Sequence, residues 1–258
     1  MKQSKYVISK RREQILNYLR ENGETRVEKL SELCQVSPLT IRRDLSALEE
    51  SRAVLRSFGS VQLAGNSDGP ATFEEKEITH RREKVKIAAE AGKHIPESAT
   101  VFMNSGTTVL EVLKVVGNRN ITVVTNNALA YTCCKHGGAQ IICTGGTYFD
   151  LTKAYVGDFA GDIVGKIYAD VCILGVNGIS TEGGLTTSVL QETIINEKMA
   201  ERCLGKVIVV ADGSKIGRTY SFVSLSLNRV GLLITDASAD VEEIDKLRGA
   251  GVDVVIME

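Results

Sequence analysis

Residues 27–55 read VEKLSELCQVSPLTIRRDLSALEESRAVL, and this stretch decides the fold of the N-terminal part of the chain. It holds two short segments with apolar residues at helical spacing, joined by a tight turn at Gln35-Val36-Ser37. Ser37 is expected to cap the second helix by accepting a hydrogen bond from one of its free N–H groups. Pro38 suits the first helical position, where its missing N–H is not needed. The pattern predicts a helix-turn-helix, a motif that reads DNA with its second helix.

The second helix has two different sides. At 100° per residue, Ile41, Leu45 and Leu48 fall on one stripe, which is expected to pack. The other side carries Thr40, Arg42, Arg43 and Ala47. These side chains suit phosphates and base edges. An ordinary amphipathic helix with a solvated arginine pair shows the same pattern, and periodicity alone favours that interpretation.

The distribution of charge favours DNA binding. Residues 1–65 contain twelve Lys or Arg against eight Asp or Glu, a net charge of +4. The remaining residues contain 19 against 24, a net charge of −5, so the total of −1 hides the asymmetry. A positive N-terminal module fits nucleic-acid binding, whereas the acidic remainder would repel DNA.

The flanking segments complete the motif. Upstream, Ile15, Leu16 and Leu19 lie at helical spacing before a stop at Glu21-Asn22-Gly23, which predicts a third helix behind the pair. Downstream, residues 53–63 (AVLRSFGSVQL) place β-prone residues on both sides of Phe58-Gly59-Ser60 and predict a short hairpin or wing. Near its tip, Arg56 and Ser57 are expected to contact the DNA backbone or the minor groove, although Arg56 is as readily a surface charge.

The run from Arg12 through Leu55, above all Val36-Ser37 followed by Thr40-Ile41-Arg42-Arg43-Asp44-Leu45, resembles the winged helix-turn-helix signature of the DeoR family of bacterial transcriptional regulators. In that family the wing tip usually reads His-Gly-Gly, whereas this chain has Phe58-Gly59-Ser60. The expected DNA-contacting residues are Arg12, Ser37, Pro38, Thr40, Arg42, Arg43, Arg56 and Ser57.

A second domain is expected to follow. The small, polar and turn-forming residues after Leu63 read as a linker, which divides the chain into a DNA-binding domain at 1–63, a linker at 64–75 and a larger domain at 76–258. The larger domain is long enough to bury its own core. It begins with a charged stretch, residues 73–94, that is expected to be one helix with Ile78, Val85 and Ala89 on its apolar side.

Strand-like and helix-like runs then alternate, which predicts an α/β fold with a mostly parallel sheet covered by helices on both faces. The expected strands are 100–103, 121–124, 140–143, 171–174, 207–210, 232–235 and 252–256, and the expected helices are 107–116, 128–136, 192–203 and 241–250.

Polar residues gather where these strands end, which is where ligands of such sheets bind. Asn104, Ser105, Gly106, Thr107 and Thr108 join a strand to a helix, whose free N–H groups and dipole favour an anion. Such a turn is as often a plain helix cap. Three further strand ends carry residues of the same kind: Thr125-Asn126-Asn127, Gly145-Gly146-Thr147 and Asp212-Gly213-Ser214-Lys215. Lys215 would supply a point charge for a phosphate, although most lysines are simply exposed.

These segments, with residues 170–180 (DVCILGVNGIS), Gly183-Gly184-Leu185-Thr186 and residues 211–217 (ADGSKIG), also resemble the DeoR family's effector domain, so the resemblance covers nearly the whole chain. That domain is similar to ribose-5-phosphate isomerase and usually senses a phosphorylated sugar. The resemblance implies that Ser105 to Thr108 and Lys215 hold the phosphate. It places the sugar against Asn126, Asn177, Thr186 and Glu192, with Gly184 and Leu185 beside them. Most members have Asp at position 104, where this chain has Asn.

An enzyme is the alternative, because a phosphosugar pocket with carboxylates could catalyse aldose–ketose isomerisation. The isomerases carry an acidic cluster where this chain has Leu174, Asn177 and Gly178, none of which can act as a base. Glu192 and Asp212 remain, so the sequence favours a sensor over an isomerase.

Other chemistries have little support in the sequence. The six cysteines lack metal-ligand spacing, and the three histidines read as surface or helix-end residues, so no metal and no cofactor are expected. The cysteines fit a reducing interior, and no secretion signal or membrane span is evident, so a cytoplasmic protein is expected. Because operators are usually read by symmetric dimers, a homo-oligomer is expected, with operator DNA and a phosphorylated sugar as its ligands.

Overall fold

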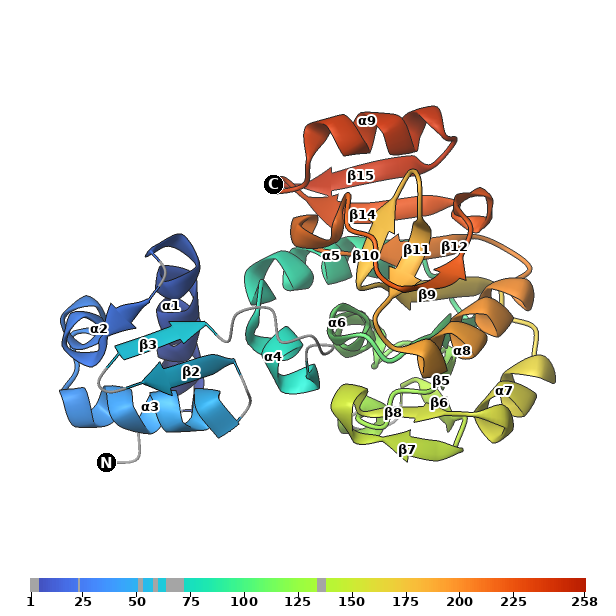
Figure 1. Ribbon diagram of the computed structural model, residues 1–258. Coiled ribbons are helices and arrows are strands. Elements are labelled where there is room, and N and C mark those ends of the chain that lie inside the picture. Colours follow the sequence, from blue (N-terminus) through green and yellow to red (C-terminus); the bar gives the residue numbers. More distant parts are fainter. Residues whose placement is uncertain (1–4, 23, 51–52, 58–59, 64–71, 134–137) are drawn as a thin grey trace. The chain divides into compact units, whose positions relative to one another are not determined.

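The computed structural model describes the 258-residue chain except for residues 1–4, 23, 51–52, 58–59, 64–71 and 134–137. The chain divides into two compact units, Met1–Thr79 and His80–Glu258. The predicted linker precedes this division, and most of it lies outside the described residues. The buried hydrophobic side chains form two separate clusters, one in each unit. Each unit also has its own helices and strands (Figure 1).

The N-terminal unit is the predicted winged helix-turn-helix. Its buried core contains Ile15, Leu30 and Ile41, which come from three different helices. The order of strands in its antiparallel sheet is β1-β3-β2, so the predicted hairpin is confirmed and a short strand before the second helix extends it. Its elements are α1 (Lys5–Asn22), β1 (Thr25–Arg26), α2 (Val27–Cys34), α3 (Pro38–Glu50), β2 (Val54–Ser57), β3 (Ser60–Leu63) and α4 (Phe73–Ile78).

Local chemistry fixes the start of α3 as the sequence predicts. Gln35 adopts the left-handed conformation with φ 52° and turns the chain between α2 and α3. Ser37 Oγ accepts a hydrogen bond from the backbone N–H of Thr40 at 3.3 Å, and Pro38 is the first residue of the helix. Both expectations about this helix start are confirmed.

The C-terminal unit is built on a seven-stranded sheet with the order β15-β14-β12-β9-β4-β5-β6, in which all neighbours are parallel. The strands are β4 (Thr100–Met103), β5 (Thr122–Thr125), β6 (Gln140–Cys143), β9 (Val171–Gly175), β12 (Val207–Val210), β14 (Leu232–Asp236) and β15 (Asp253–Met257). The helices are α5 (Arg81–Lys93), α6 (Thr107–Val116), α7 (Asp158–Gly165), α8 (Leu190–Glu201) and α9 (Val241–Gly249). The predicted α/β class and parallel sheet are confirmed.

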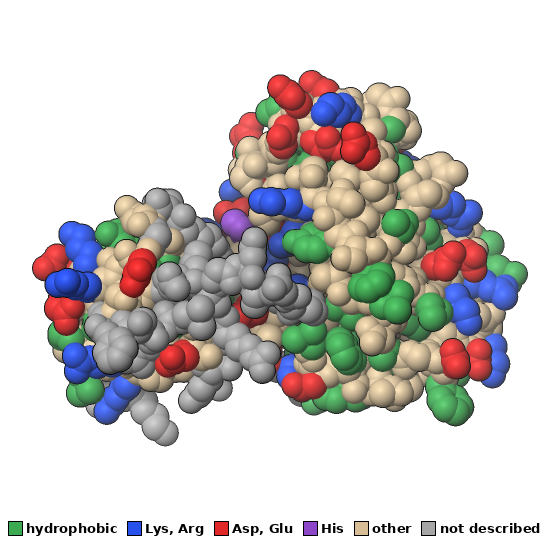
Figure 2. Space-filling model, in the orientation of Figure 1, with side chains coloured by type: hydrophobic (Ala, Val, Ile, Leu, Met, Phe, Trp, Pro, Cys, Tyr) green, Lys and Arg blue, Asp and Glu red, His purple; other side chains and the backbone are tan. Residues whose placement is uncertain are grey.

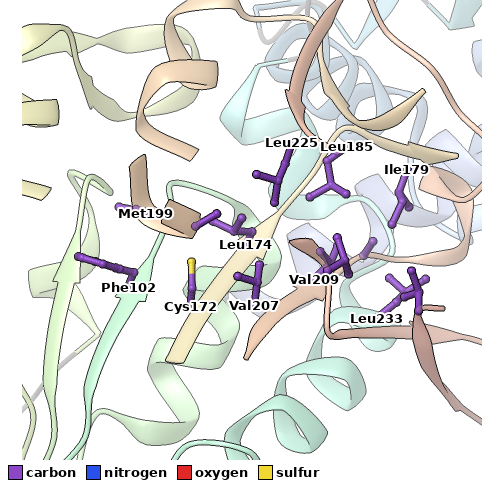
Figure 3. Close-up of a cluster of buried hydrophobic side chains, with 14 of the residues drawn as sticks. Phe102, Cys172, Leu174, Ile179, Leu185, Met199, Val207, Val209, Leu225 and Leu233 are labelled. Carbon is purple, nitrogen blue, oxygen red and sulfur yellow. The ribbon is translucent and has the colours of Figure 1, made fainter. Parts of the chain in front are cut away.

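One face of this sheet carries the main core. Phe102, Leu174 and Val209 point from the sheet into a cluster that also takes Met199 from α8 and Leu247 from α9 (Figure 3). Helices α5 and α6 pack against each other and belong to the opposite face, since none of their residues joins this cluster. Helices thus cover both faces, and the strand ends remain as the place for a ligand.

Two antiparallel pieces in the C-terminal unit were not predicted. A small sheet has the order β10-β11-β13, with β10 (Gly178–Ser180), β11 (Gly184–Thr187) and β13 (Phe222–Leu225). A hairpin pairs β7 (Thr147–Phe149) with β8 (Ala154–Val156). The small sheet contributes Ile179, Leu185 and Leu225 to the main core (Figure 3).

The prediction of one helix over residues 73–94 was wrong. The helix breaks at Thr79-His80, where His80 takes the left-handed conformation with φ 51°. Val85 and Ala89, expected on the apolar side, are exposed. The buried stripe of α5 is instead Lys84, Ile87, Ala88 and Ala91. Because Lys84 is a charged residue on the buried side, the pattern of apolar residues did not indicate which side of α5 is buried.

The helix expected over residues 128–136 was also wrong for the described residues, which form only the 3₁₀ turn η1 (Ala130–Thr132). The start of this segment pairs with the neighbouring hairpin. Ala128 N–H donates to the Lys153 carbonyl at 2.9 Å, and Asn127 forms an isolated bridge with Ala154. The hairpin thus supplies partners for the backbone groups at the start of this segment.

Candidate functional site

Helix α3 presents the predicted DNA-reading side of the N-terminal unit. Ile41 and Leu45 are fully buried, while Arg42 and Arg43 are exposed on the other side of the helix. The arginines are thus free to reach phosphates or base edges, which is the geometry that the sequence predicted.

A buried ionic network holds this helix in place. Asp44 on α3 is only 3% exposed, and its two oxygens accept hydrogen bonds from the Nε atoms of Arg11 and Arg12 on α1. Arg12, predicted to contact DNA, bonds Asp44 in the structure and so helps to hold α1 against α3. The side chains of Arg56 and Ser57, predicted at the wing, lie outside the described residues, as do residues 58–59 of its tip.

In the C-terminal unit, the turn between β4 and α6 (residues 104–108), called the cradle below, combines a helix N-terminus with buried polar side chains. Gly106 is the N-cap of α6 and makes no side-chain cap hydrogen bond to the N–H groups of the first turn. Ser105, Thr107 and Thr108 are each 9% exposed or less. The N-terminus of a helix carries about half a positive charge, which attracts an anion.

Asn104 supports this cradle from beneath. Its Nδ2 donates to the Gly175 carbonyl at 2.9 Å and to Asn196 Oδ1 at 3.0 Å, and its Oδ1 accepts the Gly175 N–H at 2.9 Å. A Cβ on Gly106 would lie 3.4 Å from the Cα of Gly175. Asn104 therefore links the ends of β4 and β9 by hydrogen bonds at the edge of the sheet that carries the cradle.

The end of β5 adds unpartnered polar atoms beside the cradle. Thr125 pairs with Met103 in the sheet, so Asn126 and Asn127 continue at the level of Asn104. Asn126 is 1% and Asn127 2% exposed. Asn126 Oδ1 and Asn127 Nδ2 have no hydrogen-bond partner, although their other amide atoms bond the backbone. Buried atoms of this kind require a partner, which a bound ligand or water supplies.

The end of β6 bends away with two glycines in the left-handed region, at φ 63° for Gly145 and 108° for Gly146. A Cβ on Gly146 would lie 2.7 Å from the Val156 carbonyl at the end of β8 and 3.1 Å from the Ala160 side chain on α7, whereas a Cβ on Gly145 would meet nothing within 4 Å. Close packing thus requires glycine at position 146, whereas Gly145 faces open space.

A second group of polar side chains surrounds Asn177, two residues after Gly175. Its Nδ2 donates to Ser188 Oγ at 2.9 Å and to Thr187 Oγ1 at 3.4 Å, and Thr187 donates to Glu192 at 3.1 Å. Glu192 lies one turn before Asn196 on α8, so both share a face of that helix. Asn177 and Glu192 are therefore brought to the Asn104 cradle, together with Thr187 and Ser188, which sequence reasoning missed.

The neighbouring residues of β11 point elsewhere. The Thr186 hydroxyl donates to the Gly178 carbonyl and accepts the Tyr220 N–H, within the small sheet. The Leu185 side chain lies in the main core. Gly184 has φ 68°, and a Cβ there would approach the Leu225 carbonyl at 2.6 Å. The structure does not bring the Leu185 and Thr186 side chains to the cradle.

The end of β12 carries a charged cluster. Asp212 is 2% exposed and accepts hydrogen bonds from the N–H and hydroxyl of Ser214. Burial raises the pKa of Asp212, but the charge of Lys215, the Ser214 hydrogen bond and the charges of His80 and Lys84 outweigh it, so the pKa is lowered. Asp212 is therefore ionised at neutral pH and lies among cations.

Lys84 belongs to this cluster and was missed by sequence reasoning. It is 4% exposed, although lysine is almost never buried without a partner. The sequence did contain a signal for it. Lys84 precedes Ile87 by three residues and Ala91 by seven, so helical periodicity places all three on the same side of α5.

Two further observations concern other site types. Among the residues that the structure describes, no cluster of three or more His, Cys, Asp or Glu is arranged to hold a metal ion. No helix in this described part is long and apolar enough to cross a membrane.

Comparison with known proteins agrees with this arrangement. Residues 79–237 match the model of the DeoR C-terminal sensor domain, and residues 11–66 match that of the DeoR-like helix-turn-helix domain. The chain belongs to the DeoR family. As a DeoR-family protein it is a DNA-binding transcriptional regulator with a C-terminal sensor domain, as the sequence predicted.

Similar proteins of this family include the transcriptional regulator GlpR of Haloferax volcanii, 34% identical over 96% of this chain and 97% of that protein. The glycerol-3-phosphate regulon repressor of Escherichia coli is 31% identical, covering 90% and 92%. The repressor GlcR of Bacillus subtilis is 30% identical, covering 95% and 94%. These DeoR-family relatives are regulators and not enzymes.

Among solved structures, the C-terminal fold is similar to ribose 5-phosphate isomerase A of Methanocaldococcus jannaschii. The TM-score is 0.38 at 15% identity, over 53% of this chain and 54% of that one.

Proposed function

We propose that this regulator represses a sugar-catabolism operon and that a phosphorylated sugar bound at the β4–α6 cradle controls its affinity for the operator. The phosphate is held by the first-turn N–H groups of α6, the hydroxyls of Ser105, Thr107 and Thr108, and Lys215. The names of two relatives support the repressor role, and one of those relatives is the repressor of a glycerol-3-phosphate regulon.

The observation that carries the proposal is the pairing of an uncapped helix N-terminus with buried, unpartnered amide atoms. The helix N-terminus supplies an anion site. Asn126 Oδ1 and Asn127 Nδ2 supply an acceptor and a donor, which match the hydroxyl groups of a sugar. Asn177 and Glu192 supply further polar contacts from the other side of the cradle. A phosphate ester of a polyhydroxy compound satisfies both halves of this site.

On the DNA side, we propose that α3 enters the major groove. Thr40, Arg42 and Arg43 then face the bases and phosphates, while Ser37 and Pro38 place the helix start near the DNA backbone. A single helix-turn-helix reads only one half-site, so a symmetric homo-oligomer is proposed. Light scattering of the purified chain tests this, and a monomer at operator-binding concentrations would contradict it.

The sensor proposal is tested by a thermal-shift screen of sugar phosphates and the matching free sugars. A ligand that binds only the native state raises Tm by mass action. The ester that raises Tm is then titrated into an operator-binding assay with the variants Thr107→Val and Lys215→Ala. A charge-assisted hydrogen bond contributes about 1.5–3 kcal/mol, so the half-maximal ester concentration should rise roughly tenfold or more.

Matched controls lie at the opposite ends of the same strands. Thr100→Val changes a threonine at the start of β4, and Lys206→Ala removes an exposed lysine just before β12. Both controls should respond to the ester like the parent. If Thr107→Val and Lys215→Ala also respond like the parent, the phosphate does not bind at the cradle. Turnover of ribose 5-phosphate by the purified chain would instead favour an isomerase.

A further inference from the structure

Leu39 is an exposed apolar side chain at the second position of α3. It is 60% exposed, whereas Ile41 and Leu45 of the same helix are fully buried. Leu39 also lies outside the buried cluster that the described residues of the N-terminal unit form. A single exposed leucine is common on protein surfaces, so its position on the helix carries the information.

That position is the centre of the side that carries the arginines. At 100° per residue, Leu39 lies between Arg42 and Arg43 around the helix, about 60° from the first and about 40° from the second. Both arginines are exposed. Leu39 is about 160° from the fully buried Ile41, so it points away from the core of the unit.

The polar side chains beside Leu39 bond each other at the start of the helix. Ser37 Oγ and Thr40 Oγ1 lie 3.0 Å apart and share a hydrogen bond, and Ser37 Oγ also accepts the Thr40 N–H at 3.3 Å. Thr40 is half-buried and lies about 100° from Leu39. In a helix-turn-helix, the first residues of the second helix contact base edges. At the centre of the arginine side, the first turn of α3 therefore offers an apolar group.

The major groove contains one apolar group that leucine matches. Each base pair shows hydrogen-bond donors and acceptors there, and thymine adds its C5-methyl group. Leucine placed against a donor or acceptor removes that group from water without giving it a partner, which costs free energy. Leucine placed against the methyl group buries apolar surface on both sides. The side chain thus favours thymine over the other bases.

We propose that Leu39 contacts a thymine methyl group in each half-site of the operator and is a specificity-determining residue of this regulator. The inference rests on the proposed function, because it requires α3 to enter the major groove. It identifies one base of the operator by chemistry. A thymine faces the first turn of α3, next to the bases or phosphates that Arg42 and Arg43 contact.

Replacement of single methyl groups in the DNA tests this. The full chain selects its strongest duplex from a random-sequence library, and each thymine of that duplex is then replaced in turn by uracil, which lacks the methyl group. One thymine per half-site should lose about fourfold in affinity, the value of one buried methyl group. Leu39→Gln has a similar length and helix propensity and should abolish this loss, while Leu39→Met keeps an apolar contact and should retain it.

The matched control is Val7→Gln, which changes an apolar residue of α1 that is 46% exposed. It should keep the affinity of the parent and its response to uracil. Equal responses of Leu39→Gln and the parent at every thymine overturn the role of Leu39, as does a parent that is indifferent to every replacement. If Arg42→Ala and Arg43→Ala bind the selected duplex like the parent, the proposed entry of α3 into the groove fails instead.

Discussion

Replacing Asp44 with Asn should loosen the DNA-binding unit without touching the sensor. Asp44 is 3% exposed, and its side chain pairs with Arg11, which is 7% exposed. Removing one partner of a buried pair costs about 3–5 kcal/mol. Asn keeps one acceptor oxygen, so the low end applies. Arg12 is 32% exposed and adds only about 0.2–1 kcal/mol. The expected loss is about 3 kcal/mol of unfolding free energy.

Hydrogen exchange measured by mass spectrometry resolves this loss by segment. A change of about 3 kcal/mol speeds exchange through unfolding of the unit roughly a hundredfold in peptides from α1 and α3. Peptides from β4 and α6 serve as internal references and should not change. Glu32→Gln breaks the exposed pair with Lys29 and is the matched control. If α1 and α3 exchange no faster in Asp44→Asn than in Glu32→Gln, the network does not hold the helix.

Arg42→Ala and Arg43→Ala should each weaken operator binding by about 1–3 kcal/mol in a gel-shift titration while leaving Tm unchanged. His80→Gly should keep stability and His80→Val should lose about 1–2 kcal/mol by denaturant titration, because φ is 51°. Asp212 has a lowered pKa, so its charge stabilises the fold above the ordinary value of 3.8 and that contribution disappears as pH falls through the folded value. The Tm advantage over Asp212→Asn should therefore vanish in acid. A fragment of residues 76–258 should fold, bind the effector and ignore DNA, as gel filtration and binding assays would show.

The helices and strands could be predicted where the spacing of apolar residues fits only one kind of element. The stripe of Ile41, Leu45 and Leu48 fixed the second helix, and continuous apolar runs such as residues 207–210 fixed the buried parallel strands. The small sheet was missed because its strands have only three or four residues each, so their length does not mark them. Strands β10 and β11 are also buried on both faces and therefore show no alternation. The hairpin of β7 and β8 was missed because each of its strands has only three residues.

The candidate site was predictable as a region and not as a set of contacts. Parallel topology brings strand ends to one edge, so the cradle and Lys215 could be expected there. Which hydroxyl meets Asn177 could not, because successive residues of a strand point to opposite faces. Thr187, and not Thr186, bonds Asn177. A shift of one residue along β11 would exchange the positions of Thr186 and Thr187, so the contact with Asn177 depends on the register of β11 in the small sheet.

Asn104 shows why an amide suits the floor of the cradle. Its Nδ2 donates to two oxygens, those of Gly175 and Asn196, while its Oδ1 accepts from the Gly175 N–H. An ionised carboxylate at this position has no hydrogen to donate, so it would face both oxygens without a bond, and its charge would oppose an anion at α6. The amide joins β4, β9 and α8 with no net charge. The side chain is fully used within the protein, so the proposed site leaves recognition of the anion to the N–H groups and hydroxyls of the cradle.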